Sequence, residues 1–159
     1  MTVLVLGLGN LLMTDDALGG RMIAELEKSY RFPQEVQLLD GGTLGLDLLP
    51  YLEGVDKLLV IDALRMGAQA GELFRLEGEE VPRAFANKLS VHQMGLQDLL
   101  AVAELQGHLP EQLVVWGIQA ESVEVGMELS PAVSGSVAEL MLSVVRELQG
   151  WGVVLKQAA

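Results

Sequence analysis

Short apolar runs alternate along the chain with longer segments of helical periodicity. Residues 3–6, 58–61 and 113–118 are apolar at nearly every position, and residues 36–39 form a similar, weaker run. Continuous apolar runs of this length are typical of strands that are buried on both faces of a sheet. Residues 72–76 instead alternate polar and apolar side chains, which predicts a half-exposed strand at a sheet edge.

Helical spacing separates these strands. Apolar side chains recur on one face from Leu18 to Tyr30, residues 44–52 and 95–105 show shorter helical patterns, and Asp15 and Asp16 stand where helix N-caps stand. The clearest helix is near the C-terminus, with Pro131 close to its start. Its apolar face consists of Val137, Leu140, Met141, Val144, Val145 and Leu148. Residues 81–88 lack a pattern and are predicted to be a loop.

This alternation predicts an α/β fold: a three-layer α/β/α sandwich around a twisted, mostly parallel, five-stranded sheet. The strand at 72–76 is expected at an edge, where it can run antiparallel to its neighbour. The chain of 159 residues fits a single domain, residues 1–159, with enough apolar side chains for its own core.

Composition excludes several classes of function. The net charge is −12 and the ten Lys and Arg residues are scattered, which argues against nucleic acid as a partner. The chain has no cysteine, so a disulfide framework, a thiolate metal site and a cysteine nucleophile are excluded. The longest uncharged stretch, residues 1–14, contains Gly7 and Gly9 and is too short to span a bilayer. With no basic leader segment, we expect a cytoplasmic protein without membrane insertion.

Polar residues follow the ends of the predicted strands. Asp16 follows the first strand, Asp40 the second, Asp62 the third and Glu121 the last, while His92 precedes a helix. In open α/β sheets, ligands bind outside the carboxyl ends of the strands. If the first and third strands are neighbours, Asp16 and Asp62 face one crevice, and His92 can join them. Two carboxylates and one imidazole form a plausible ligand set for a divalent transition metal.

Each of these residues also has a purely structural interpretation. Asp15 or Asp16 can cap a helix, and a histidine such as His92 is more often a hydrogen-bonded surface or core residue than a ligand. Asp40 either orients His92 or a ligand carboxylate, or bonds its own backbone in a turn. Asp62 is the strongest candidate, because a charge directly after an apolar strand needs a partner.

The glycine motif after the first strand does not predict a nucleotide site. The dinucleotide fingerprint requires a third glycine, where this chain has Leu12. Asp15 and Asp16 also place negative charge where a phosphate would bind a helix N-terminus. The chain contains no H-E-x-x-H, G-x-S-x-G or P-loop motif. The residues alone therefore predict only a carboxylate–histidine metal site on an α/β scaffold.

Several blocks of sequence resemble the hydrogenase maturation endopeptidases, which process the large subunits of NiFe-hydrogenases. The blocks occur in order over essentially the whole chain: LGLGNLLMTDD at 6–16, DGGT at 40–43, IDA at 61–63, NKLSVHQMGL at 87–96, and GIQAES at 117–122 followed by LSP at 129–131. Two positions depart from the family pattern. Asp16 stands where close relatives often have glutamate, and Ala120 replaces a common proline.

The resemblance implies an endopeptidase that removes the C-terminal extension of a nickel-loaded large-subunit precursor. It also implies that Asp16, Asp62 and His92 are the metal-binding and catalytic residues. Nickel is then expected to arrive with the substrate and to serve in recognition, although such a ligand set also suits Zn²⁺. The metal can either activate the scissile carbonyl or a water, or serve only in docking. The alternative function is a non-catalytic, metal-binding α/β chaperone for the same precursor.

Overall fold

A five-stranded sheet forms the centre of the protein in the computed structural model, which describes residues 1–43, 45–85 and 91–158, without the side chains of 84, 85 and 91–95. The strand order is β3-β1-β4-β6-β5. The parallel strands are β1 (Val3–Leu8), β3 (Val36–Gly42), β4 (Lys57–Leu64) and β6 (Gln112–Gln119), and β5 (Leu73–Glu77) runs antiparallel at one edge. The predicted sheet, its antiparallel edge and the β1–β4 neighbours are confirmed.

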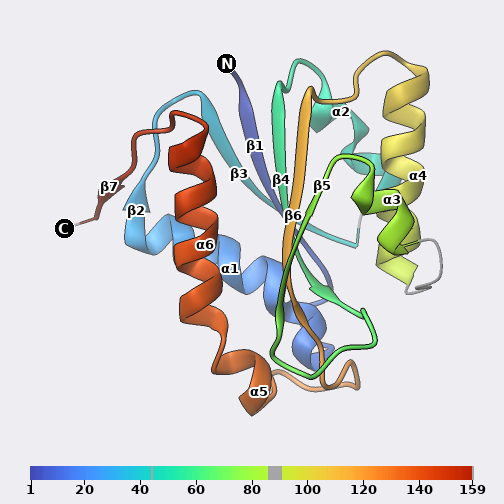
Figure 1. Ribbon diagram of the computed structural model, residues 1–159, viewed down its shortest axis with the longest axis vertical. Coiled ribbons are helices and arrows are strands. Elements are labelled where there is room, and N and C mark those ends of the chain that lie inside the picture. The colour runs from blue at the N-terminus through green and yellow to red at the C-terminus, as the bar shows by residue number, and fades with distance from the viewer. Residues whose placement is uncertain (44, 86–90, 159) are drawn as a thin grey trace.

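Helices cover both faces of the sheet, so the three-layer prediction is also confirmed (Figure 1). One layer contains α1 (Leu18–Ser29) and α6 (Val137–Gly150). The other contains α2 (Leu49–Leu52), α3 (Glu80–Phe85) and α4 (Val91–Leu105). The shorter elements are two 3-10 turns, η1 (Thr14–Ala17) and η2 (Gly45–Leu48), the helix α5 (Pro131–Ser134), and the paired strands β2 (Tyr30–Arg31) and β7 (Lys156–Gln157).

Side chains of the central strand β4 alternate between two apolar cores. Leu59 and Ile61 pack in the core under α1 and α6, whereas Leu58 and Val60 pack in the core under α2 and α4. This alternation follows from the two-residue period of a strand. Because both faces are covered, the middle of β4 is apolar at every position from Leu58 to Ile61.

Two glycines allow α1 to lie directly on the ends of the strands. A Cβ atom on Gly19 would stand 2.2 Å from the carbonyl oxygen of Leu8 and 2.7 Å from that of Ile61. A Cβ on Gly7 would stand 2.3 Å from the carbonyl oxygen of Gly19. No side chain fits at these distances, so the glycines bring the first turn of α1 against the carboxyl ends of β1 and β4. Their role here is close packing.

Two expected boundaries were wrong. The segment predicted as a loop at 81–88 begins with α3, whose Val81 is fully buried; residues 86–90 lie outside the described residues. The six residues of α3 make fewer than two helical turns, which is too few to show a helical period in the sequence. The C-terminal helix is divided, because α5 ends at Ser134 and α6 begins at Val137, with Gly135 and Ser136 between them. Ser130 caps the separate helix α5 by accepting a bond from the Val133 amide (3.3 Å).

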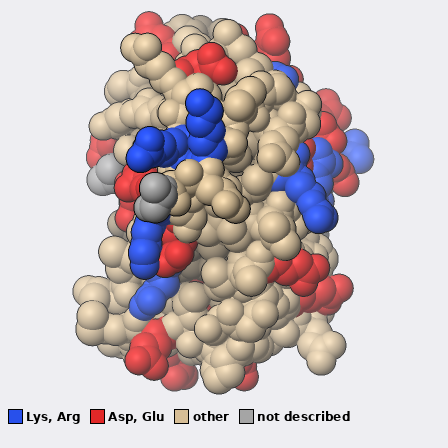
Figure 2. All heavy atoms as spheres, turned by 90° about the vertical axis from the view of Figure 1, so that its left-hand side faces the viewer, with Lys and Arg blue, Asp and Glu red and all other residues tan. Residues whose placement is uncertain are grey.

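Charged side chains are unevenly distributed over the face covered by α1 and α6. Lys and Arg gather in a few clusters in its upper and middle parts, and the charged side chains at its lower end are acidic (Figure 2). The lower end is where the parallel strands finish (Figure 1). A negative potential is therefore expected at this end of the molecule.

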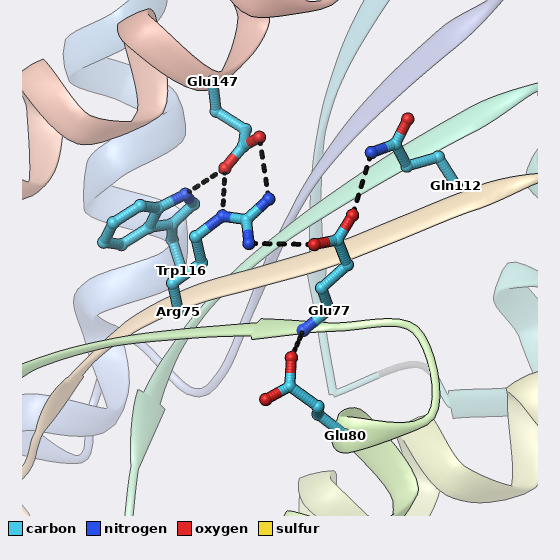
Figure 3. A network of polar contacts seen from close by, with 6 residues as sticks. All are labelled: Arg75, Glu77, Glu80, Gln112, Trp116 and Glu147. Carbon is cyan, nitrogen blue, oxygen red and sulfur yellow. Dashed lines mark hydrogen bonds and ion pairs between the residues drawn. The ribbon is translucent and has the colours of Figure 1, made fainter.

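A network of ionic hydrogen bonds fastens the antiparallel edge strand to the helical layer (Figure 3). Arg75 of β5 donates to both carboxylate oxygens of Glu147 in α6, at 2.6 and 3.1 Å, and to Glu77 at 3.0 Å. The indole of Trp116 also donates to Glu147, at 2.9 Å. The bond from Arg75 is the main cause that lowers the pKa of the Glu147 carboxyl and raises the pKa of Arg75.

We expect Glu147→Gln to lower the free energy of unfolding at pH 7 by about 1 kcal/mol, because Arg75 and Trp116 lose a charged acceptor. The folded pKa of Glu147 lies below its unfolded value of about 4.3. Its contribution is therefore present above that pH and is lost as the pH falls through the folded pKa. Urea unfolding from pH 3 to 7 measures this, with the exposed Glu139→Gln as control. If the difference in free energy of unfolding between wild type and Glu147→Gln did not narrow at low pH, the lowered pKa of Glu147 would be contradicted.

Candidate active site

The predicted functional residues lie at the carboxyl ends of the parallel strands, the lower end of the sheet in Figure 1. Three segments meet there: the turn from Gly9 to η1, the end of β4, and the loop that follows β6. The first and third are joined by a bridge between Met13 and Gly126. This is the edge at which α/β sheets bind their ligands.

Asp62 is fully buried near the end of β4. Strand alternation puts its side chain on the same sheet face as Val60 and Leu64, which belong to the core under α4. Helix α4 begins at Val91, at the lower end of the same layer (Figure 1). The backbone of His92 thus lies in the first turn of the helix that covers this face, while its side chain lies outside the described residues.

Asp16 lies in η1, next to β4, and is only 7% exposed. Its Oδ2 accepts a bond from the amide of Asn10 at 2.9 Å. Gly9 makes this turn possible, since its φ is +123° and a Cβ there would stand 1.8 Å from the Asp16 carbonyl oxygen. The N-cap interpretation of Asp16 is wrong, because Ala17 occupies the N-cap of α1 without a side-chain bond.

Asp15 has a structural role at this site, which the sequence did not reveal. Its carboxylate is fully buried and accepts four hydrogen bonds from the loop after β6. The donors are the amides of Glu121 (2.8 Å), Ser122 (2.9 Å) and Ser130 (2.7 Å), and the hydroxyl of Ser130 (2.9 Å). Asp15 therefore folds this loop around itself, and its N-cap interpretation is wrong as well. The only signal in the sequence was the joint presence of DD, ES and LSP in the family blocks.

Further hydrogen bonds join the two loops along their length. The amide of Thr14 donates to Gly126 (2.8 Å), and the amide of Gly126 donates to Leu12 (2.9 Å). The Thr14 hydroxyl donates to the carbonyl of Ser122 (2.7 Å), and the guanidinium of Arg21 donates to the carbonyl of Met127. Thr14 has a φ of +48°, a strained value that the surrounding bonds maintain. The loops consequently form one fixed unit.

A cavity of about 480 Å³ opens beside this unit, between the ends of β4 and β6. Gln119 forms its fixed wall, because this buried amide accepts from the Met66 amide (2.7 Å) and donates to the Ala120 carbonyl (3.0 Å). Arg65 lines one part of the cavity, and Glu121 lines another. A cavity of this size can accommodate a segment of extended peptide.

The other predicted positions have structural contacts. Asp40 is exposed, and its Oδ1 accepts from the amide of Gly42 (3.1 Å), as in the turn interpretation. The side chain of Glu121 is exposed, and its amide serves Asp15. Among the described side chains, no three His, Asp or Glu residues form a cluster that could hold a metal ion. His92 is outside that set, so the joint site of Asp16, Asp62 and His92 stays a prediction.

Comparisons with known proteins agree with this architecture. The sequence profile of the family described as hydrogenase maturation protease matches residues 21–147. The chain is 40% identical over 154 residues to the hydrogenase 2 maturation protease of Escherichia coli strain K12, which covers 96% of this chain and 94% of that protein. This chain belongs to the hydrogenase maturation protease family. The resemblance seen in the sequence is thereby confirmed.

Other members of the family have closely similar structures. The solved structure of the hydrogenase maturating endopeptidase HybD from E. coli matches with a TM-score of 0.95 and 38% identity, over 99% of this chain and 98% of that one. The NiFe hydrogenase maturation protease HybD from Thermococcus kodakarensis matches with a TM-score of 0.77 and 30% identity, over 93% and 99%. The protein is therefore a peptidase of hydrogenase maturation. Among the described helices, none has the length and apolar character needed to cross a bilayer.

We expect Asp15→Asn to destabilise this peptidase by about 2–4 kcal/mol. The amide keeps one acceptor oxygen but turns an NH₂ group toward backbone amides that are themselves donors. Urea-induced unfolding measures the change. Asp47→Asn, at an exposed carboxylate, is the matched control and should change stability by less than about 0.5 kcal/mol. Equal stability of the two variants would show that the Asp15 bonds do not hold the loop.

Proposed function

We propose that this protein removes the C-terminal extension of a NiFe-hydrogenase large-subunit precursor that already carries nickel. The observation that carries the proposal is the position of Asp62, a fully buried carboxylate at the carboxyl end of β4, in a hydrogenase maturation protease fold. Asp16 lies in the neighbouring turn η1, and the backbone of His92 lies in the first turn of α4 on the same sheet face as Asp62. These placements are compatible with one shared site.

The nickel in this proposal is part of the substrate. Two carboxylates and an imidazole provide oxygen and nitrogen donors, which suit Ni²⁺ and also accept Zn²⁺. Asp16 and Asp62 have 7% and 0% exposure, so little solvent competes with a metal at their carboxylates. Nickel held by these residues would act as the signal that the precursor is ready for cleavage. The bound ion would also polarise a carbonyl group or a water molecule near it.

The cavity beside the site gives the peptide chain a place to bind. It begins directly after β4, three residues beyond Asp62, and ends in the loop that Asp15 holds. An extended tail that enters it passes Arg65 and Glu121, which carry opposite charges. The fixed wall at Gln119 supports an orientation of the tail relative to the carboxylates. We infer that the chain's own contribution to cleavage is mainly recognition and positioning.

Replacing a proposed ligand should abolish processing without unfolding the protein. For His92→Ala and Asp62→Asn, we expect the cleavage rate of nickel-loaded precursor to fall on the order of 100-fold or more. His108→Ala and Asp47→Asn, both at exposed positions, are the matched controls. Mass spectrometry of the precursor measures cleavage, and circular dichroism verifies the fold. Normal cleavage by both folded site variants would refute the site assignment, and an unchanged precursor mass with wild type would indicate a binding protein that does not cut.

Precursor made without nickel should resist cleavage by the purified wild-type protein, because the three proposed ligands then have no ion to bind in the substrate. Adding Ni²⁺ to the precursor before the peptidase should restore cutting. The same mass measurement reports both results. Efficient cleavage of metal-free precursor would remove nickel recognition from the proposal while leaving the peptidase activity intact.

A further inference from the structure

Four large apolar side chains project from the two loops at the active-site end. Leu11 and Leu12 are 49% and 57% exposed, and Val125 and Met127 are 84% and 71% exposed. The amide of Gly126 donates to the carbonyl of Leu12, so the segment that carries Leu11 and Leu12 lies beside the segment that carries Val125 and Met127. Soluble proteins seldom expose adjacent apolar side chains of this size unless they contact a partner. We call these four residues the apolar ridge.

The ridge is held in a fixed conformation. Asp15 accepts four hydrogen bonds from its loop, and Thr14 adds backbone and hydroxyl bonds to Gly126 and Ser122. Gly126 has no room for a side chain, since a Cβ there would stand 2.7 Å from a methyl group of Thr14. Prior ordering lowers the entropy that a surface loses on binding. A buried carboxylate is therefore used to present apolar side chains to solvent in one geometry.

The ridge is continuous with the candidate active site. Leu12 precedes Asp16 by four residues in the same turn, and Val125 follows the cavity residues Ser122 and Glu124 in the same loop. A folded protein that delivered its tail to Asp62 would have to lie against this surface. The occupant that fits this position is thus the folded body of the substrate.

Charge defines the chemistry of that occupant. Residues 10–16 and 121–130 contain five carboxylates and no Lys or Arg. Three of these carboxylates, Glu121, Glu124 and Glu128, are exposed around the ridge. Arg21 of α1 adds one positive charge beside them, because its guanidinium bonds the carbonyl of Met127. A complementary surface has an apolar depression with Lys and Arg at its rim.

We propose that the apolar ridge docks into an apolar, basic-rimmed depression on the folded body of the hydrogenase precursor. This inference rests on the proposed function for the identity of the partner. The ridge would supply affinity that does not depend on the metal. It would set KM, whereas the predicted ligands set kcat.

The double variant Val125→Ser/Met127→Ser tests the ridge. With nickel-loaded precursor, we expect KM to rise about tenfold or more while kcat stays within about twofold, since truncated apolar contacts at interface centres cost this much. The equilibrium Kd for nickel-free precursor should rise by a similar factor. Leu105→Ser/Val154→Ser removes two apolar side chains of 87% and 70% exposure elsewhere and should change neither constant. Val125→Ile/Met127→Leu should bind like wild type.

The two proposals fail in different ways. Wild-type protein that binds the precursor through the ridge but leaves its mass unchanged would refute the peptidase proposal and support the ridge. The ridge proposal would be overturned if the Ser double variant had the same Kd as wild type. It would also be overturned if the Leu105→Ser/Val154→Ser control lost as much affinity as the Ser double variant. Absence of any binding by wild type would overturn it too.

Replacing Glu124 and Glu128 by Gln should weaken the salt dependence of association, and an unchanged salt dependence would contradict the basic rim.

Discussion

The buried carboxylate of Asp15 is the interaction on which the active-site end depends. Burying a charge is costly unless hydrogen bonds replace its hydration. Here three amides and one hydroxyl do so, all from the segment between Glu121 and Ser130. The same bonds satisfy amides of a loop that lacks the regular pairing of a sheet. One side chain thus converts an irregular loop into a fixed wall of the site.

Backbone contacts complete what Asp15 begins. Gly19 lets the first turn of α1 lie against the carbonyl groups of Leu8 and Ile61, and Gly9 lets the chain close around Asp16. These close approaches hold η1 at the ends of β1 and β4. As a result, the two consecutive aspartates have different partners. Asp15 accepts hydrogen bonds from the loop after β6, and Asp16 accepts one from the amide of Asn10 beside β4. Both aspartates lie in the short turn η1, where consecutive side chains point in different directions.

The sequence predicted the longer helices and strands well because burial requires an apolar side chain at many of their positions, at regular spacing. Every residue of β1 is buried, and α6 buries Leu140, Val144 and Leu148 on one face. Helix α3 was missed because its six residues have too few positions to show a period. Asp15 was misjudged because an N-cap and an acceptor of distant amides have the same local sequence. The contacts of Asp15 join residues more than 100 positions apart, which no local pattern records.

The proposed site separates recognition of the metal from recognition of the protein. The carboxylates Asp16 and Asp62 are buried and polar, whereas the ridge residues Val125 and Met127 are exposed and apolar. Two contacts that must form together discriminate more strongly than either alone, because their binding free energies combine in one complex. Such a division also explains why rigidity is concentrated here. A loop that moved would uncouple the ridge from the carboxylates, so the bonds of Asp15 fix the geometry on which joint recognition depends.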